Sequence, residues 1–449
     1  MQVIPGHTAK AQPAWPVPAY AWYVVAIFIV AYSFAICDRA ILSLLVQPIK
    51  TDLGLTDSEI GLLQGLAFAV CYTSFGLVLG FIADRTDRRM LFSASIAVWS
   101  IATVACGLST SFATMFVSRI FVGLGEACLV PVAGSLIADY MPPASRARAY
   151  GLLLLGGTFG TLGGQLVGGH AIEIATFVRA FSPTAIDVLH DWQIAFLVVG
   201  APGVLVAIAF ALTVREPVRR ERAGLAGASL RAVFAHARLN RTAYATLLGA
   251  AALNVLCIYA QIAWVPTLLI RTYGWTPENV SLFLIPGAIA GATSSVTVGW
   301  IMARLLARGY SDAPMIAVLG HAAITFIFGT LTFAGSGAWA TGLFYVLLSL
   351  GANWSTSAAL MGVAQIAPNE LRGQLSALYT FMTGLLSLSV GPWLVGALSD
   401  RVFPGATGLR WSLMAVFAVA SAMALLIVMF GRQAFRAAAA RARVWMVLN

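Results

Sequence analysis

Four charged side chains lie inside apolar runs that hold no other well-buried charges, and these residues are best suited to chemistry. Asp38 and Arg39 are adjacent in one run, and Arg119 and Glu126 lie seven residues apart in another. A charge inside a membrane costs on the order of 3 kcal/mol or more, so such groups face a cavity or pair with one another. A carboxyl group that alternates between apolar surroundings and an arginine can bind and release a proton. The four residues therefore indicate a site for ion pairing and proton exchange.

The depth of these residues follows from the helical rise of about 1.5 Å per residue. Asp38 and Arg119 are each roughly 11 Å from the same end of their spans, so their side chains can meet. Glu126 lies two turns beyond Arg119 on the same face, near the bilayer midplane, where transporters bind their substrates. The alternative, for the Asp38, Arg39 and Arg119 group and for Glu126, is a fixed ion-pair network that only joins two helices.

The composition excludes a water-soluble protein. Of 449 residues, 60% are hydrophobic and 10% are charged, and the mean hydropathy is +0.87. So few polar side chains cannot cover a globule in water, and the surrounding medium must be lipid. The net charge of +10 invites a nucleic-acid interpretation. However, the arginines lie in short connectors and form no single basic face, so we expect no nucleic-acid partner.

Twelve apolar runs are long enough to cross a bilayer, in two sets of six. The predicted spans are residues 20–46, 58–83, 90–108, 112–140, 149–174, 192–213, 243–271, 279–303, 313–334, 338–367, 374–399 and 409–431. We predict an all-α membrane protein with a cytoplasmic N-terminal segment (1–19), a six-helix bundle (20–213), a basic linker (214–241), a second six-helix bundle (242–431) and a basic tail (432–449). The linker and the tail fit helices on the anionic inner leaflet or, equally, solvated connectors.

The distribution of Lys and Arg predicts the orientation, because these residues resist translocation. With the N-terminus inside, twenty of the 27 lie on the cytoplasmic side, five lie outside, and Arg39 and Arg119 lie within spans. An even number of spans then places both termini in the cytoplasm. We expect a multi-pass protein of the cell inner (plasma) membrane.

No enzyme chemistry stands out in the sequence. The five cysteines lie in apolar runs without metal-ligand spacing, and no nucleophile with a neighbouring base is visible. The fifth span is rich in glycine, but no strand precedes it and no Lys-Ser/Thr pair follows. Small residues at that spacing let helices pack closely instead. We expect no enzyme activity, no cofactor and no bound metal.

The second half offers neutral and aromatic groups where the first half offers charges. Pro142–Arg146 and Pro368–Arg372 repeat at an offset of 226 residues, as expected of a duplicated unit. The candidates for the second wall of a cavity are Asn254, Gln261, Trp264, Asn353 and Trp354. The lone polar residues among these candidates, and His321, could equally serve only to form hydrogen bonds between helices. Charge on one wall and aromatic groups on the other suit an amphipathic solute better than a sugar.

The connection between the second and third spans carries the sharpest motif, Gly80-Phe81-Ile82-Ala83-Asp84-Arg85-Thr86-Asp87-Arg88-Arg89. It resembles the signature of the major facilitator superfamily, with Asp87 in place of the usual second glycine. Asp84 can accept hydrogen bonds from the N-terminus of a facing helix, and Arg88 can form an ion pair with Asp139. The resemblance implies a cytoplasmic latch of the outward-open state, formed by Gly80, Asp84, Arg85, Arg88, Arg89 and Asp139. The alternative is a positive stop signal without a gating role.

Three further motifs narrow the resemblance. They are Cys37-Asp38-Arg39-Ala40, Arg119-Ile120-Phe121-Val122-Gly123-Leu124-Gly125-Glu126-Ala127 and Asp191-Trp192-Gln193-Ile194-Ala195-Phe196. Together with the turn they resemble the spinster-like branch, whose members are implicated in moving sphingolipids, lysolipids and related amphiphiles.

The charges and this resemblance predict a monomeric secondary transporter that moves a small amphipathic or organic-anion solute by alternating access. Glu126 and Asp38 would couple transport to protons, and Arg39 and Arg119 would contact the solute. The alternatives are a multidrug or organic anion transporter of the same fold, and a non-transporting receptor or scaffold.

Overall fold

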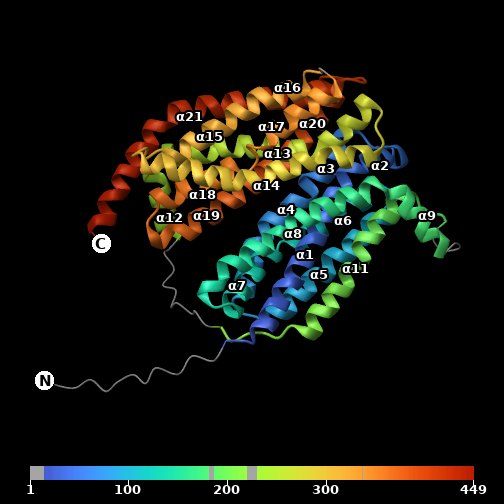
Figure 1. Ribbon diagram of the computed structural model, residues 1–449, viewed down its shortest axis with the longest axis horizontal. Helices are drawn as coiled ribbons and strands as arrows, with labels where there is room; N and C mark the ends of the chain where they lie inside the picture. Colours follow the sequence, from blue (N-terminus) through green and yellow to red (C-terminus); the bar gives the residue numbers. More distant parts are fainter. Residues whose placement is uncertain (1–14, 182–186, 220–229, 336, 449) are drawn as a thin grey trace.

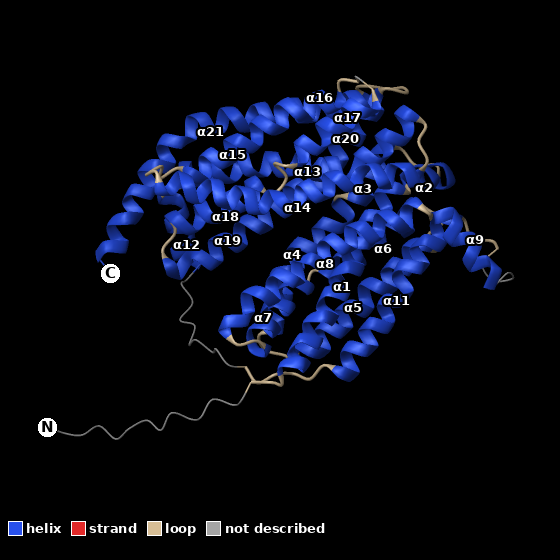
Figure 2. Cartoon of the chain, viewed as in Figure 1, coloured by secondary structure: helices blue, strands red, loops and turns tan. Residues whose placement is uncertain are grey.

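The two halves of the chain form two helical bundles that converge at one end and diverge at the other (Figure 1). The computed structural model describes residues 15–181, 187–219, 230–335 and 337–448. Within these residues the regular structure is entirely helical (Figure 2). Twelve segments of the described chain are long and apolar enough to cross a membrane. The predicted fold class, an all-α membrane protein of two six-helix bundles, is confirmed.

The first bundle precedes the linker. Its helices are α1 (Pro18–Leu44), α2 (Val46–Leu53), α3 (Asp57–Gln64), α4 (Leu66–Ala83), α5 (Arg88–Gly107), α6 (Phe112–Glu126), α7 (Leu129–Tyr140), α8 (Pro143–Gly169), α9 (Ala171–Phe181) and α11 (Asp191–Thr213). The short helices α2 and α9 were not among the predicted spans, and they lie at the end where the bundles converge (Figure 1). We call this the far end and the opposite one, where α11 ends and α13 begins, the linker end.

The second bundle follows α12 (Leu230–Leu239) of the linker. Its helices are α13 (Arg241–Tyr273), α14 (Pro277–Ala307), α15 (Ala313–Ile324), α16 (Thr330–Phe333), α17 (Ala338–Ser349), α18 (Trp354–Ile366), α19 (Asn369–Thr383), α20 (Ser389–Arg401) and α21 (Gly408–Leu448), with π-helical turns η1 (Thr325–Gly329) and η2 (Gly384–Leu388). The π turns interrupt the ninth and eleventh spans, and such turns are frequent at functional sites.

The fourth and tenth spans are interrupted at equivalent positions of the two halves. α6 gives way to α7 at Ala127 and Cys128, and α17 gives way to α18 over residues 350–353. The offset of 226 residues places Ala127 of the first break on Asn353 of the second. Such breaks persist only where neighbouring groups satisfy the freed backbone. The paired breaks support a duplicated six-helix unit.

The last span runs far beyond its predicted end at residue 431, because its basic residues find an acceptor on the second bundle. The carboxylate of the buried Asp312 accepts a hydrogen bond of 2.8 Å from Arg432 Nε, and Arg436 Nε lies 3.0 Å from the same oxygen. Burial by itself would raise the pKa of Asp312, but the two guanidinium groups outweigh burial and hold this pKa below its ordinary value. The first part of the predicted tail is therefore a continuation of α21.

The described parts of the linker divide between the bundles. Residues 214–219 contact the first bundle, whereas Val233 of α12 is buried against the second. The other predicted features, residues 1–14 with Lys10 and residues 220–229 with Arg220 and Arg222, lie outside the described residues.

The glycines of α8 pack directly on α1. A Cβ at Gly160 would lie 2.4 Å from the carbonyl oxygen of Ser33, and one at Gly164 would lie 2.5 Å from Ala40 Cβ. Carbon atoms do not approach other atoms so closely, so only glycine fits. The prediction that these glycines serve close helix packing is confirmed.

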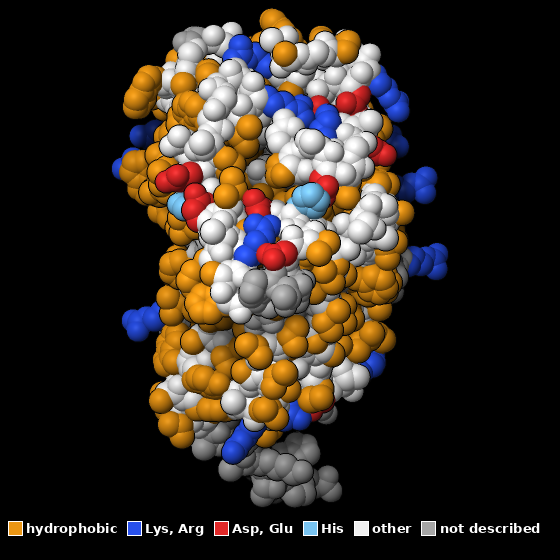
Figure 3. Space-filling view, turned by 90° about the vertical axis from the view of Figure 1, so that its right-hand side faces the viewer, with side chains coloured by type: hydrophobic (Ala, Val, Ile, Leu, Met, Phe, Trp, Pro, Cys, Tyr) orange, Lys and Arg blue, Asp and Glu red, His pale blue; other side chains and the backbone are white. Residues whose placement is uncertain are grey.

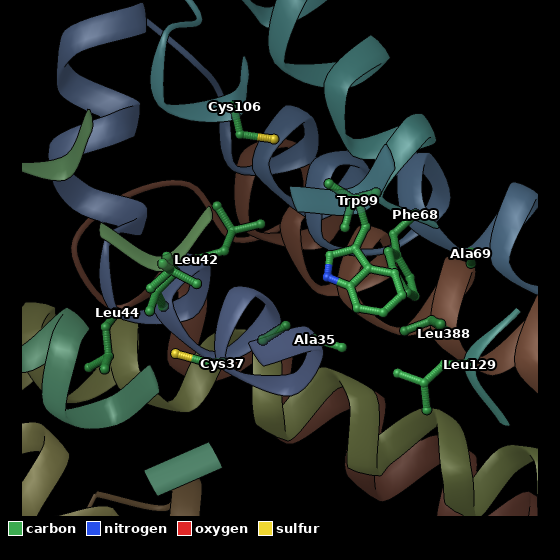
Figure 4. Packing of buried hydrophobic residues seen from close by; sticks show 14 of the residues in the cluster. Ala35, Cys37, Leu42, Leu44, Phe68, Ala69, Trp99, Cys106, Leu129 and Leu388 are labelled. Atoms are coloured by element: carbon green, nitrogen blue, oxygen red, sulfur yellow. The ribbon is translucent and has the colours of Figure 1, made fainter. Parts of the chain in front are cut away.

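One apolar core crosses from the first bundle to the second. Figure 4 shows part of it, including Phe68, Trp99 and Leu388, which are 1%, 2% and 6% exposed. Leu388 belongs to the second bundle, and it lies with Ala69 and Leu129 of the first in this view. The core keeps water away from the charged side chains next to it.

Candidate functional site

Asp38 of α1 and Arg119 of α6 form a buried ion pair. Arg119 Nη1 donates to Asp38 Oδ2 over 2.5 Å, and Thr103 Oγ1 of α5 donates to Asp38 Oδ1 over 3.0 Å. Both charged side chains are at most 2% exposed. Each oxygen of Asp38 thus has a hydrogen-bond donor. The contact between Asp38 and Arg119 that the helical rise predicts is present in the structure.

Arg39 of α1 pairs with Glu126 of α6. Arg39 Nε donates to Glu126 Oε2 over 2.9 Å, and Nη2 also donates to that oxygen. The guanidinium lies over the Phe68 and Tyr72 rings, 4.2 and 4.7 Å from their centres. Such contacts hold a cation by attraction to the ring face. We refer to Asp38, Arg39, Arg119 and Glu126 as the charged cluster.

Glu126 differs from Asp38 in one respect. Its second oxygen, Oε1, is buried and has no hydrogen-bond partner among the described residues. A buried carboxylate oxygen without a donor is costly, and protonation would remove part of that cost. Of the two acids, Glu126 therefore has the less fully hydrogen-bonded carboxyl group.

The glycines before Glu126 set its position. A Cβ at Gly123 would lie 2.3 Å from the Phe68 carbonyl oxygen, and one at Gly125 would lie 2.7 Å from Trp99 N. Because only glycine fits at these two points, α6 lies directly against α4 and α5. The helix ends at Glu126, so the carboxyl group is placed at the break of the fourth span.

Three tyrosines surround the Arg39–Glu126 pair and were not predicted from the sequence. Tyr32, Tyr72 and, from α13 of the second bundle, Tyr259 interact electrostatically with Arg39, and Tyr32 does so with Glu126 as well. The Arg39 side chain is 25% exposed, whereas Glu126 is only 1% exposed. The arrangement presents a partly exposed cation among aromatic side chains, with a buried carboxyl group beside it.

Two predicted cavity residues are buried between helices in this conformation. Asn254 and Trp264 are fully buried in the second bundle. Asn254 Nδ2 donates to Ser355 Oγ over 2.8 Å, and Trp264 Nε1 donates to the Pro392 carbonyl over 2.8 Å. Because helix packing turns both side chains toward neighbouring helices here, their contact with a solute stays a prediction for other conformations.

The other three second-bundle candidates lie at helix contacts but keep some exposed surface. Gln261 Nε2 donates to Ser349 Oγ over 3.3 Å. Asn353 Nδ2 donates to the Gly291 carbonyl over 3.0 Å, and Trp354 Nε1 lies 3.3 Å from Thr297 Oγ1. Asn353 is the most exposed of the three, so these residues stay candidates for solute contact.

The signature turn (residues 80–89) is held by the linker. Arg88 is buried, and it donates from Nη1 to Asp139 over 2.6 Å and from Nε to Glu216 of the linker over 2.7 Å. Arg219 of the linker donates to the carbonyl oxygens of Ala83, Asp84 and Thr86, which end α4. Arg88 and Asp139 pair as the sequence suggested. Glu216 and Arg219 were missed, because charges in a basic connector look solvated.

The rest of the signature turn makes local contacts. Arg85 lies over the Phe81 ring at 3.4 Å, and the Arg89 amide donates to Glu216 over 3.1 Å. A Cβ at Gly80 would meet only Pro131 Cβ, at an ordinary 3.7 Å, so no tight helix approach occurs at Gly80 in this conformation. The exposed side chain of Asp84 has no hydrogen bond or ion pair with another described residue.

Charged residues join the two bundles at the far end, which Figure 3 faces. Asp57 at the start of α3 accepts two hydrogen bonds of 2.7 Å from Arg271 of α13, and it also accepts from Lys50 and Ser399. Asp400 of α20 accepts from the backbone amides of Asp57 and Ser58. A carboxylate at a helix N-terminus is well placed electrostatically. We call Lys50, Asp57, Arg271, Ser399 and Asp400 the far-end lock.

Backbones also meet at the far end. A Cβ at Gly61 would lie 2.6 Å from the Pro392 carbonyl oxygen, and one at Gly396 would lie 2.2 Å from the Asp57 carbonyl oxygen. The two bundles therefore touch without space for side chains between α3 and α20. The far end is closed in this conformation.

Asp57→Asn is expected to open the far end. The substitution removes the charge that Lys50 and Arg271 contact, which is worth about 1.5 to 3 kcal/mol in the closed state only. We expect a Ser389→Cys probe to react with a water-soluble maleimide at least about tenfold faster in Asp57→Asn, because Ser389 is buried beside Gly65, the residue between α3 and α4.

Asp52→Asn is the matched control for this measurement. Asp52 lies at the same end, but it accepts from Trp192 within the first bundle. Equal labelling of the probe in Asp57→Asn, Asp52→Asn and the parent protein would show that the far-end lock does not hold the bundles together.

Comparison with known proteins agrees with the fold of two six-helix bundles. The model of the Major Facilitator Superfamily matches residues 27–392. An MFS-type efflux pump of Mycolicibacterium smegmatis is 25% identical, with 86% of each chain covered. Human protein spinster homolog 1 is 26% identical over 86% of this chain and 74% of that protein.

A solved structure has the same fold. It is a bacterial homolog of the human lysosomal transporter spinster, in an inward-facing and unoccupied conformation, with a TM-score of 0.80 and 23% identity over 95% of this chain and 98% of that one. These relatives are transporters and not enzymes. The described residues include no group of three or more His, Cys, Asp or Glu that could hold a metal. The chain is therefore a multi-pass membrane transporter that belongs to the Major Facilitator Superfamily, and the spinster homologs are among the members that it is similar to.

Proposed function

We propose that the protein is a proton-coupled secondary transporter of a small amphipathic solute with an anionic head, and that the charged cluster is its coupling site. The observation that carries this proposal is the Arg39–Glu126 pair. Arg39 is partly exposed among aromatic rings, and Glu126 behind it has one buried oxygen without a donor. A solute anion that draws Arg39 away leaves Glu126 without its cation, which favours protonation of the carboxyl group.

The two-bundle arrangement supports alternating access. The far end is closed by the far-end lock, and the helices of the two bundles diverge toward the linker end (Figure 1). The excess of Lys and Arg at the linker end supports a cytoplasmic location for that end in the inner (plasma) membrane. The conformation is then inward-facing, and a monomer contains the complete charged cluster.

Asp84→Asn is expected to lower the labelling of the Ser389→Cys probe, opposite to Asp57→Asn. In the proposed cycle Asp84 contacts the second bundle only when the linker end closes, so its charge stabilises the outward-open state by about 1.5 to 3 kcal/mol. We expect the maleimide rate to fall about tenfold. Asp87→Asn, in the same turn but capping α5, is the control. Unchanged labelling in Asp84→Asn would favour a simple positive stop signal.

The proposed function is tested in proteoliposomes that enclose a pH dye. A lysophospholipid, a sphingoid base and an aromatic carboxylate are each added under an imposed pH gradient. We expect the lysophospholipid or the aromatic carboxylate, which carry anionic groups, to be driven by the proton gradient and to dissipate it, whereas the cationic sphingoid base should not be. Solute movement at the same rate with and without the pH gradient would exclude proton coupling. No movement of any tested solute, with or without a gradient, would favour the receptor or scaffold alternative.

A further inference from the structure

The break in the tenth span is surrounded by a second polar cluster, which contains no ion pair. His321 of α15, Ser355 of α18 and Asn254 of α13 are all buried within the second bundle. His321 Nδ1 lies 2.8 Å from Ser355 Oγ, and Asn254 Nδ2 donates to that same Oγ over 2.8 Å. Asn254 also donates to the Val318 carbonyl over 3.3 Å. Three helices are thus tied together at one point.

The direction of these hydrogen bonds defines the state of the imidazole. The backbone amide of Ser355 donates to His321 Nδ1 over 3.3 Å. An amide can donate only to a nitrogen that carries a lone pair, so this hydrogen bond requires Nδ1 to be unprotonated. Ser355 Oγ accepts from Asn254 and can direct its own proton to the same Nδ1. The hydrogen bonds of this cluster can therefore all donate in one direction, from Asn254 to Ser355 and from Ser355 to His321.

His321 acts on the first turn of α18, where amides lack partners inside the helix. α18 begins at Trp354, and its preceding residue Asn353 offers no side-chain cap. The ring of His321 also lies against the break itself, because a Cβ at Gly351 would be 3.1 Å from His321 Cδ2. His321 supplies from another helix the acceptor that a capping residue normally supplies.

The two breaks are supported in different ways. In the fourth span, Glu126 at the end of α6 is held by the cation of Arg39. In the tenth span, hydrogen bonds between uncharged groups of His321 and Ser355 hold the start of α18 instead. The first break therefore depends on charge and the second does not.

We propose that His321 is a positioning residue of the tenth span, which caps α18 from α15 and thereby holds Asn353 and Trp354 against α14. Asn353 N and Nδ2 bond to Ser294 and Gly291 of α14, and Trp354 bonds to Thr297. These contacts require α18 to start at Trp354. This role does not depend on the identity of the solute or on proton coupling.

Hydrogen exchange of the full-length protein in nanodiscs tests the proposal. In His321→Ala we expect amide exchange in the peptide covering residues 350–360 to rise at least tenfold, while peptides from α1 and α6 keep wild-type exchange. His321→Asn places an oxygen near the position of Nδ1 and should restore protection to within threefold. His321→Gln places its oxygen one bond further out and should behave like His321→Ala.

Three results would overturn the proposal. They are wild-type exchange at residues 350–360 in His321→Ala, an equal rise in every span, and equal protection in His321→Asn and His321→Gln. The last comparison stands even if His321→Ala fails to fold, because both polar variants can keep the buried site hydrogen-bonded. A merely structural role for His321 would not distinguish the two oxygen positions.

Discussion

Glu126→Gln is expected to abolish solute movement driven by a pH gradient while the protein stays folded. Glutamine keeps the size of the side chain and an oxygen that can accept from Arg39, but it cannot titrate. Because Glu126 Oε1 is buried without a donor, it is the carboxylate oxygen of the charged cluster most suited to take up a proton. We expect gradient-driven flux in proteoliposomes to fall at least about tenfold, with solute binding retained.

Asp38→Asn is the matched control, because it removes the other acid of the charged cluster. Both oxygens of Asp38 already accept hydrogen bonds, from Thr103 and Arg119, so we expect Asp38→Asn to disturb helix contacts more than the pH response. Loss of the pH response in Asp38→Asn alone would reverse the two roles. A wild-type pH profile and gradient dependence in Glu126→Gln would refute the assignment of Glu126.

Arg119→Ala is expected to destabilise the protein by about 3 to 5 kcal/mol, because it leaves the buried carboxylate of Asp38 without its cation. The Asp38 side chain is 1% exposed, so water cannot replace the guanidinium. In the double variant Arg119→Ala with Asp38→Asn, the orphaned charge is absent, and we expect at least half of the lost stability to return. Thermal unfolding in detergent measures the single and double variants.

The unfolding data also separate structure from function at this pair. Additive losses in the melting temperature for Arg119→Ala and Asp38→Asn would contradict their coupling. Thr103→Val removes only the neutral donor to Asp38, and we expect a loss of about 0.5 to 1.5 kcal/mol from it. The contrast between Thr103→Val and Arg119→Ala isolates the contribution of charge.

The sequence by itself determined the fold class and the charged cluster. The spans follow from the length of apolar runs, because a bilayer accepts only helices whose backbone groups bond within the segment. Asp38, Arg39, Arg119 and Glu126 stand out because charge is rare in such runs. Their mutual reach follows from the helical rise alone, since a helix has one spacing whatever surrounds it.

Tertiary structure decided which partners these residues have and which way the neutral side chains face. The sequence left open whether Arg39 or Arg119 would pair with Glu126. The structure pairs Glu126 with Arg39, while the glycines at 123 and 125 let α6 lie directly against α4 and α5. Tyr259 could not be selected, because aromatic side chains are common in membrane helices. Asn254 and Trp264 have the residue types of a cavity wall but lie buried between helices. Helical periodicity gives the angle between side chains on one helix, whereas the rotation of that helix against its neighbours is set by packing between helices far apart in sequence.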